Sequence, residues 1–171
     1  MDLVPYNPSS RIISSGYYST VNTIFIGGKT MTGDATKLYI SWEDVNELVF
    51  KLFKELGKQD IDKVVGISRG GLIPGVMLSH WLGAGFEPLE WQTRDGEFQD
   101  KIKANGFNKN LKGTIFVDDI CDSALTIKQI KEIIPNSRWA VLHQKADIEL
   151  DFVGERLHNN DKRWIVYPWE T

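Results

Sequence analysis

Carboxylates and hydroxyls are concentrated in one short stretch of the chain, VDDICDSALT at residues 117–126. An apolar run, Thr114 to Val117, leads into it, and the length and the β-branched and aromatic content of this run are typical of a buried parallel strand. The apolar positions from Leu125 to Ile134 fall at helical spacing, so a helix is expected to begin near Ser123 or Ala124. The stretch therefore predicts a strand that stops at its carboxylates, a polar loop and a helix. Its polar side chains are Asp118, Asp119, Asp122, Ser123 and Thr126.

A strand that enters a helix through such a loop directs backbone N–H groups and the helix dipole at one point, which suits a phosphate dianion. Carboxylates beside an anion site fit a ligand that also carries hydroxyls or a metal ion. A ribose 5-phosphate with Mg²⁺ meets both conditions, because the loop takes the phosphate while Asp118 and Asp119 take ribose hydroxyls or metal-bound water. The alternative is an acidic turn without a ligand, in which Asp122 or Ser123 caps the helix.

The same arrangement of strand, loop and helix is expected a second time, in VVGISRGGLIPG at residues 64–75. Its loop is Ser68-Arg69-Gly70-Gly71, in which the two glycines let the backbone approach an anion closely and the arginine adds a fixed positive charge. Taken alone, this loop is equally compatible with a tight turn that carries a solvated arginine. Two phosphate-type loops at the carboxyl ends of neighbouring parallel strands predict a ligand with a phosphate at each end.

Length and composition favour a single intracellular α/β domain. The chain has 171 residues, 42% hydrophobic and 25% charged, with a net charge of −3. This charge argues against a broad nucleic-acid-binding face, and the single cysteine, Cys121, excludes an internal disulfide framework. No apolar run reaches the roughly 20 residues of a membrane span, and the amino-terminal residues lack the pattern of a signal peptide. We therefore expect a soluble, cytoplasmic protein with no nucleic-acid partner and no membrane anchor.

The pattern along the chain divides it into an extension, residues 1–37, and a main domain, residues 38–171. The extension is expected to form a β-hairpin that turns at Gly27-Gly28 and acts as an oligomerisation arm, a flap or a cover for a sheet edge. In the main domain, strands alternate with helices, which predicts a parallel sheet covered on both faces. Residues 93–112 are polar and are expected to form a lid, and residues 146–162 are expected to be a polar connector without a strand.

The quoted motifs resemble those of a known family. VDDICDSALT resembles the phosphoribosyl-pyrophosphate (PRPP) motif of type I phosphoribosyltransferases, and the Ser68–Gly71 loop resembles the pyrophosphate-binding loop of the same enzymes. The resemblance spans about Lys37 to Trp169. It implies a single-domain α/β fold with a small hood contributed largely by about residues 146–171, a cis peptide bond between Ser68 and Arg69, Mg²⁺ as cofactor, and a homodimer or homotetramer.

The resemblance also assigns roles to individual residues. Asp119 lies nearest the metal, and Asp122 is the candidate general base. The PRPP 5′-phosphate and ribose are bound by Asp118, Asp119, Asp122, Ser123, Ala124, Leu125 and Thr126, and the pyrophosphate by Ser68, Arg69, Gly70 and Gly71. Ala124 and Leu125 depart from the family pattern, which has one or two glycines at these positions.

Within the family, SRGGLIPG, Lys145 and Trp164 most resemble the bacterial-type xanthine-guanine phosphoribosyltransferases. There the matching lysine donates to the purine 6-oxo group, and the matching tryptophan, followed by Ile165, stacks on the purine. The implied activity is transfer of 5-phosphoribosyl from PRPP to guanine, xanthine or hypoxanthine, with release of pyrophosphate. Taken alone, a lysine such as Lys145 is more often a surface charge, and a tryptophan such as Trp164 is more often a core residue. Two alternatives are a PRPP-binding regulator with little catalytic activity and a phosphoribosyltransferase for another nitrogenous base.

Overall fold

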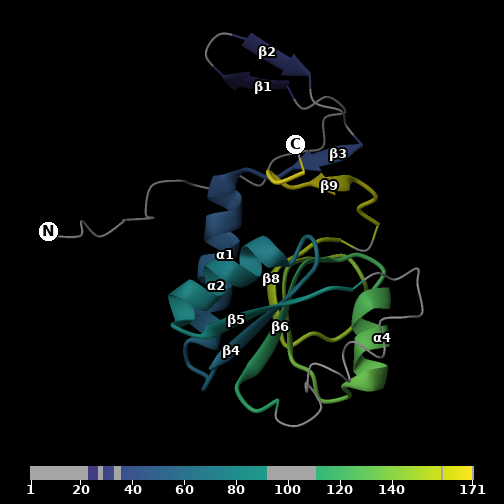
Figure 1. The fold of residues 1–171 in the computed structure, drawn as a ribbon. Helices are drawn as coiled ribbons and strands as arrows, with labels where there is room; N and C mark the ends of the chain where they lie inside the picture. The colour runs from purple at the N-terminus through teal and green to yellow at the C-terminus, as the bar shows by residue number, and fades with distance from the viewer. Residues whose placement is uncertain (1–22, 27–28, 33–35, 92–110, 159, 171) are drawn as a thin grey trace, which may run out of the picture.

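A five-stranded parallel sheet forms the centre of the molecule (Figure 1), with the strand order β5-β4-β6-β7-β8. The computed structural model describes residues 23–26, 29–32, 36–91, 111–158 and 160–170. All neighbouring pairs run parallel, which confirms the predicted α/β architecture. The strands are β4 (Lys63–Ile67), β5 (Gly85–Leu89), β6 (Thr114–Cys121), β7 (Trp139–Gln144) and β8 (Phe152–Arg156).

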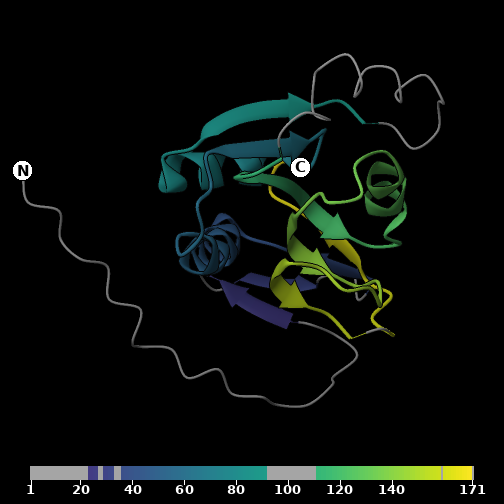
Figure 2. The ribbon, with the colours of Figure 1, turned by 90° about the horizontal axis from the view of Figure 1, so that it is seen from below.

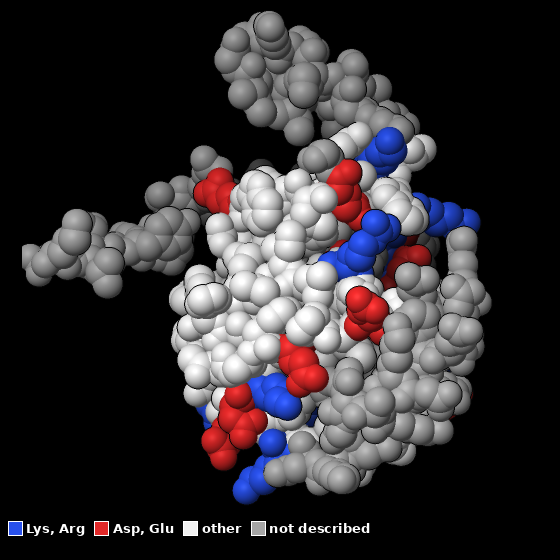
Figure 3. All heavy atoms as spheres, in the orientation of Figure 1, with Lys and Arg blue, Asp and Glu red and all other residues white. Residues whose placement is uncertain are grey.

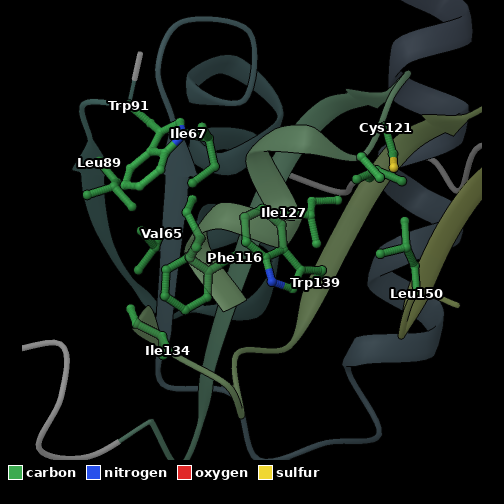
Figure 4. Close-up of a cluster of buried hydrophobic side chains, with 13 residues drawn as sticks. Val65, Ile67, Leu89, Trp91, Phe116, Cys121, Ile127, Ile134, Trp139 and Leu150 are labelled. Carbon is green, nitrogen blue, oxygen red and sulfur yellow. The ribbon is translucent and has the colours of Figure 1, made fainter. Parts of the chain in front are cut away.

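Helices cover both faces of this sheet (Figure 2). On one face, Val49 of α1 and Leu78 of α2 are buried in one cluster with Val117 of the sheet. On the other face, Ile127 of α4 belongs to a second buried cluster with Trp139 (Figure 4). Burial on both faces explains why the central strands are apolar throughout rather than alternating. The helices are α1 (Trp42–Leu56), α2 (Leu72–Leu82) and α4 (Leu125–Ile133).

The helix ends follow from local sequence. Ser41 caps α1, because its hydroxyl accepts a hydrogen bond from the Asp44 backbone at 3.1 Å while the Asp44 carboxylate accepts one from the Ser41 backbone at 2.8 Å. This is the reciprocal capping box that stabilises helix starts. Helix α2 ends at Gly83, whose φ of 65° is left-handed and is a conformation that glycine adopts without a steric penalty.

Two expectations about the strands were wrong. Strand β6 does not stop at Val117 but continues through the carboxylates to Cys121, because its far end pairs with β7 through Ile120 and Cys121. The expected connector at 146–162 contains β8, which forms the edge of the sheet beside β7. Its side chains are mostly half-buried or exposed, so the apolar pattern that reveals a strand is weak here.

Two small sheets lie outside the main sheet. Strand β3 (Lys37–Tyr39) pairs in parallel with β9 (Trp164–Val166), so the start of the main domain meets its carboxyl-terminal segment. Strands β1 (Thr23–Ile26) and β2 (Lys29–Thr32) pair antiparallel, with Gly27-Gly28 between them. The boundary between an extension and a main domain stays a prediction, as does the hood, to which β8 does not contribute because it lies in the main sheet. The expected lid falls outside the described residues except for Leu111 and Lys112.

On the side that Figure 3 shows, the surface over α2 is largely free of charge, because this helix contains no Asp, Glu, Lys or Arg. Phe50 of α1 and Trp81 of α2 are exposed there and meet edge to face, with ring centroids 5.3 Å apart. Within the described residues, no helix is both long and apolar enough to cross a membrane.

Candidate functional site

The two predicted loops meet at the carboxyl end of β4 and β6, which are neighbours in the sheet. A Cβ at Gly70 would lie 2.0 Å from the Asp119 carboxylate, and one at Gly71 would lie 2.3 Å from the Val117 carbonyl oxygen. Gly71 is therefore required by the close approach of two backbones, whereas a Cβ at Gly70 would displace the Asp119 carboxylate. The structure therefore brings the Ser68–Gly71 loop against the carboxylates of β6.

The first loop, between β4 and α2, is fixed at its start. The peptide bond between Ser68 and Arg69 is cis, as the resemblance implied. The Ser68 backbone donates to the Leu89 carbonyl at 2.9 Å, and its hydroxyl accepts a hydrogen bond from the Trp91 backbone at 3.2 Å. The Arg69 side chain is exposed at the same edge of the sheet, where its guanidinium is available to an anion.

The adjacent carboxylates Asp118 and Asp119 are held on strand β6. The Asp118 carboxylate accepts a hydrogen bond from the Asp119 backbone at 3.0 Å, and the Asp119 carboxylate accepts one from the Ile120 backbone at 2.8 Å. Burial, followed by the charge of Asp119, raises the pKa of Asp118 well above its usual value. Burial also raises the pKa of Asp119, with a further contribution from the charge of Glu170. A raised carboxylate pKa of this kind is common in binding sites, where a cation or ligand hydroxyl groups would stabilise the charged form.

Side chains that are distant in sequence hydrogen-bond to the backbone of this carboxylate pair. The Tyr167 hydroxyl donates to the Asp119 carbonyl at 2.9 Å, and the Nδ1 atom of His143 lies 2.8 Å from the same hydroxyl. Burial raises the pKa of Tyr167, so the hydroxyl stays a donor. Sequence reasoning missed the roles of Tyr167 and Glu170, because no local pattern marks a contact between β6 and the last residues of the chain.

The second loop, between β6 and α4, is open. Asp122 and Ser123 are exposed, whereas Ala124 is buried and adopts a left-handed φ of 62°. Ala124 itself occupies the N-cap position of α4, with no side-chain capping hydrogen bond. The N-cap position is thus taken by Ala124 rather than by Asp122 or Ser123, although the Ser123 hydroxyl accepts a hydrogen bond from the Leu125 backbone at 3.4 Å. Leu125 begins the helix and is 48% exposed, so its bulk faces solvent rather than the core.

The predicted base-binding residues lie beside the second loop. Lys145 donates to the Arg163 carbonyl at 2.6 Å, and its ammonium group lies 3.6 Å from the Asp122 carboxylate. Trp164 is next in the chain and is 64% exposed, whereas Ile165 is 4% exposed and packs into the core. Lys145 and Asp122 are thus brought into contact, and Trp164 is not the core residue that the alternative required. The remaining predicted residue, Thr126, is partly buried in the first turn of α4.

The residues present fit Mg²⁺ held in part by a substrate. No cluster of three or more potential metal ligands exists among the described histidines, cysteines and acidic residues. Mg²⁺ commonly uses one or two carboxylates together with substrate phosphates and water. Asp119 suits this role, because its carboxylate faces the backbone of Gly70 in the first loop. Cys121 is unsuited to metal binding, since burial raises the pKa of its thiol to about 11.

Comparison with known proteins identifies the class to which this fold and site belong. No family model matches the chain. A purine phosphoribosyltransferase of Pyrococcus horikoshii superposes with a TM-score of 0.64 at 27% identity, covering 80% of this chain and 95% of that one. A xanthine-guanine-hypoxanthine phosphoribosyltransferase of Helicobacter pylori shares the fold with a TM-score of 0.53 at 18% identity, over 77% of this chain and 92% of that one. The chain thus has the type I phosphoribosyltransferase fold, as its motifs predicted.

Proteins with similar sequences are named as one kind of phosphoribosyltransferase. A xanthine-guanine phosphoribosyltransferase of Desulfotalea psychrophila is 27% identical over 142 residues, which is 77% of this chain and 85% of the relative. One of the same name from Idiomarina loihiensis is 24% identical over 78% of this chain and 87% of its own length. The predicted resemblance to xanthine-guanine phosphoribosyltransferases is confirmed, as is the prediction of an enzyme of the phosphoribosyltransferase class.

Proposed function

We propose that this protein transfers 5-phosphoribosyl from PRPP to a 6-oxopurine, namely guanine, xanthine or hypoxanthine, and releases pyrophosphate. The observation that carries the proposal is the contact between the first loop and β6, in which the Gly70 backbone lies so close to the Asp119 carboxylate that a Cβ would be 2.0 Å from it. This contact brings an arginine-bearing loop for pyrophosphate beside the carboxylates that would bind ribose. The relatives named xanthine-guanine phosphoribosyltransferase support the choice of acceptor.

In the proposed reaction, the bond between C1′ and the pyrophosphate oxygen breaks as a purine ring nitrogen bonds to C1′. Arg69 and the Gly70 and Gly71 amides stabilise the charge that develops on the departing pyrophosphate. Asp118 and Asp119 orient the ribose, and the loop before α4 holds the 5′-phosphate. Asp119 would hold Mg²⁺, which supplies further charge neutralisation to the pyrophosphate.

The acceptor would be bound between Trp164 and Lys145. The exposed indole of Trp164 offers a face for stacking, which is worth roughly 1–3 kcal/mol for any base. Lys145, whose ammonium lies 3.6 Å from Asp122, would donate to the 6-oxo group and disfavour a 6-amino group. Asp122 would accept the proton that the ring nitrogen releases.

A PRPP-binding regulator with little catalytic activity is the second candidate. It is favoured by Ala124, whose left-handed φ of 62° stands where the family has glycine, and by Leu125 beside it. A homodimer or homotetramer in the cytoplasm is expected on the resemblance alone, and light scattering of the purified chain would give the mass.

The test is incubation with PRPP, Mg²⁺ and one base at a time, namely guanine, xanthine, hypoxanthine or adenine, with pyrophosphate release as the readout. We expect release with at least one 6-oxopurine, reduced about 10²- to 10⁴-fold by Asp122→Asn. Asp60→Asn, an exposed carboxylate before β4, is the matched control and should retain full activity. Release with no base, in a protein that PRPP still protects from thermal unfolding, would reject the transferase and favour the regulator.

The Lys145 assignment has a separate test. Lys145→Gln removes the charged donor, so the preference for a 6-oxopurine over adenine should fall by about tenfold or more. An unchanged preference in an active variant would show that another group selects the base.

A further inference from the structure

A cavity of about 290 Å³ lies between the start of α1, strand β3 and the carboxyl ends of β7 and β8. It contains none of the residues assigned to PRPP or to the purine. Its volume is roughly ten times the 30 Å³ that one water occupies in the liquid, so it has room for a short organic molecule. Part of its wall is aliphatic, from Leu38, Ile40, Leu48 and Leu157.

His143, which also lines the cavity, is 1% exposed, and its tautomer follows from its neighbours. The Tyr167 hydroxyl uses its single proton to donate to the Asp119 carbonyl, at 2.9 Å. The Nδ1 atom of His143, 2.8 Å from the same hydroxyl, must therefore carry a proton and donate it to the hydroxyl oxygen. In the neutral imidazole, Nε2 is then an acceptor.

This acceptor faces another acceptor. Nε2 of His143 lies 3.6 Å from a carboxylate oxygen of Glu155, and two acceptors form no hydrogen bond with each other. Protonation of the imidazole would supply the missing donor, but burial lowers the pKa of His143 to about 4. Within the part of the chain that the structure describes, no group donates to Nε2. The His143 side chain is 1% exposed and lines the cavity, so its unpartnered nitrogen points to a donor that occupies the cavity.

The charges around the cavity indicate a cationic donor. Three carboxylates line it, those of Asp44, Glu47 and Glu155. Arg163 also lines it, but its guanidinium is paired with Asp161 through two contacts, Nε to Oδ1 at 3.0 Å and Nη2 to Oδ2 at 2.6 Å. The excess charge on the lining is therefore negative, and besides His143 the uncharged part of the wall consists of Tyr39 and the four aliphatic side chains.

We propose that this cavity binds a small aliphatic amine in its ammonium form. The ammonium group donates to Nε2 of His143 and to Glu155, and the methylene chain packs on the aliphatic wall. Three hydrogen bonds connect the bound amine to Asp119: from the amine to Nε2 of His143, from Nδ1 to the Tyr167 hydroxyl, and from that hydroxyl to the Asp119 carbonyl. Because the amine holds the imidazole in its Nδ1-protonated form, it stabilises the hydrogen bond that Tyr167 makes to the Asp119 carbonyl.

The test is titration of the ¹⁵N-labelled full chain with putrescine at neutral pH and constant ionic strength, with the histidine side-chain nitrogens observed by NMR. His143→Gln assigns the His143 signals. We expect the Nδ1-protonated tautomer before addition, and a saturable shift of Nε2 with a dissociation constant on the order of 1 mM or tighter. The melting temperature should rise with putrescine along the same saturation curve.

Matched controls separate this site from general charge attraction. Glu155→Gln should weaken the response about tenfold or more, whereas Glu132→Gln removes the same charge from α4 on the opposite face and should leave it unchanged. Uncharged 1,4-butanediol should produce no saturable shift. The proposal is overturned by an Nε2-protonated tautomer, by no saturation up to about 50 mM putrescine, by an equal response in Glu155→Gln, or by butanediol acting as putrescine does. An equal response in Glu155→Gln, or a response to butanediol, would leave ordinary water as the hydrogen-bond donor to Nε2.

Discussion

The two strand-to-helix loops are built on the same plan but are held in different ways. The first loop, after β4, is fixed by close backbone packing, because Gly70 and Gly71 lie against the end of β6 with no room for a Cβ. The second loop, after β6, is open to solvent, and the β6 carboxylates that precede it are supported by Tyr167 from the far end of the chain. Glycine is indispensable in the first loop for lack of space.

In the second loop, the position that the family fills with glycine requires a backbone conformation rather than space. Ala124 adopts the left-handed φ of 62° itself, at a steric cost of roughly 1–2 kcal/mol for a residue with a Cβ. A glycine in a motif can therefore meet either of two physical requirements, lack of space for a Cβ or a left-handed backbone. Alanine is tolerated where only the left-handed backbone is required, and it is not tolerated where there is no space.

The largest effect is expected from Gly70→Ala. Its new Cβ would meet the Asp119 carboxylate at 2.0 Å, so this side chain must leave its position, and a displacement of about 1 Å in a site typically costs about 10²-fold in function. Protection by PRPP against thermal unfolding measures this loss. Gly85→Ala is the control, since its Cβ would meet only the Asp62 carbonyl at 3.6 Å. Equal PRPP protection in the two variants would show that the loops need not touch.

The hydrogen-bonded support of Asp119 should be sensitive to acid, because it contains His143. Burial lowers the pKa of His143 from 6.5 to about 4, so the unfolded chain binds a proton that the folded chain does not between these values. The free energy of unfolding therefore rises with pH across this window and falls as the solution is acidified, by about 3 kcal/mol at pH 4. Urea unfolding from pH 7 to 4 measures the trend, and the difference between wild type and His143→Gln isolates it. Parallel curves for the two proteins would contradict a buried neutral imidazole.

Tyr167→Phe should have a somewhat smaller effect on the same support. It leaves the Asp119 carbonyl and the Nδ1 proton of His143 without their partner, at a cost of roughly 1–3 kcal/mol in the free energy of unfolding. Tyr39→Phe, at an exposed position, should change it by less than about 0.5 kcal/mol. Denaturant unfolding compares the two, and equal stabilities would mean that Tyr167 only fills space.

The smallest effect is expected from Ala124→Gly. Relief of the left-handed strain gains roughly 1–2 kcal/mol, and the greater freedom of the unfolded glycine chain costs about 0.4–1 kcal/mol. The variant should therefore be more stable by about 0.5 kcal/mol. At Ala84 the φ is not left-handed, so Ala84→Gly relieves no strain and only increases the freedom of the unfolded chain. This variant should be less stable than wild type. Destabilisation of both variants to the same extent would show that Ala124 is not strained.

Local patterns predicted much of this molecule. The two strand-to-helix loops depend on neighbouring residues, and each was predicted from a short window of sequence. The resemblance also anticipated the cis bond before Arg69.

Features that depend on distant residues were missed. Strand β8 was taken for a connector because an edge strand needs little apolar pattern. Strand β6 was ended too early, because carboxylates ordinarily interrupt a buried strand and only its pairing with β7 carries it to Cys121. The contact of Tyr167 with Asp119 joins residues 48 positions apart, and no local propensity encodes such a pair.

The central claim is that the two loops form one site for a ligand with a phosphate at each end. Titration calorimetry with Mg²⁺ tests it by comparing PRPP with its two halves, ribose 5-phosphate and pyrophosphate. The account predicts that the halves bind together without excluding each other, and that PRPP displaces both and binds more tightly than either, since linked groups gain from their high effective concentration. If PRPP bound no more tightly than ribose 5-phosphate, or left pyrophosphate in place, the loops would not form a single site.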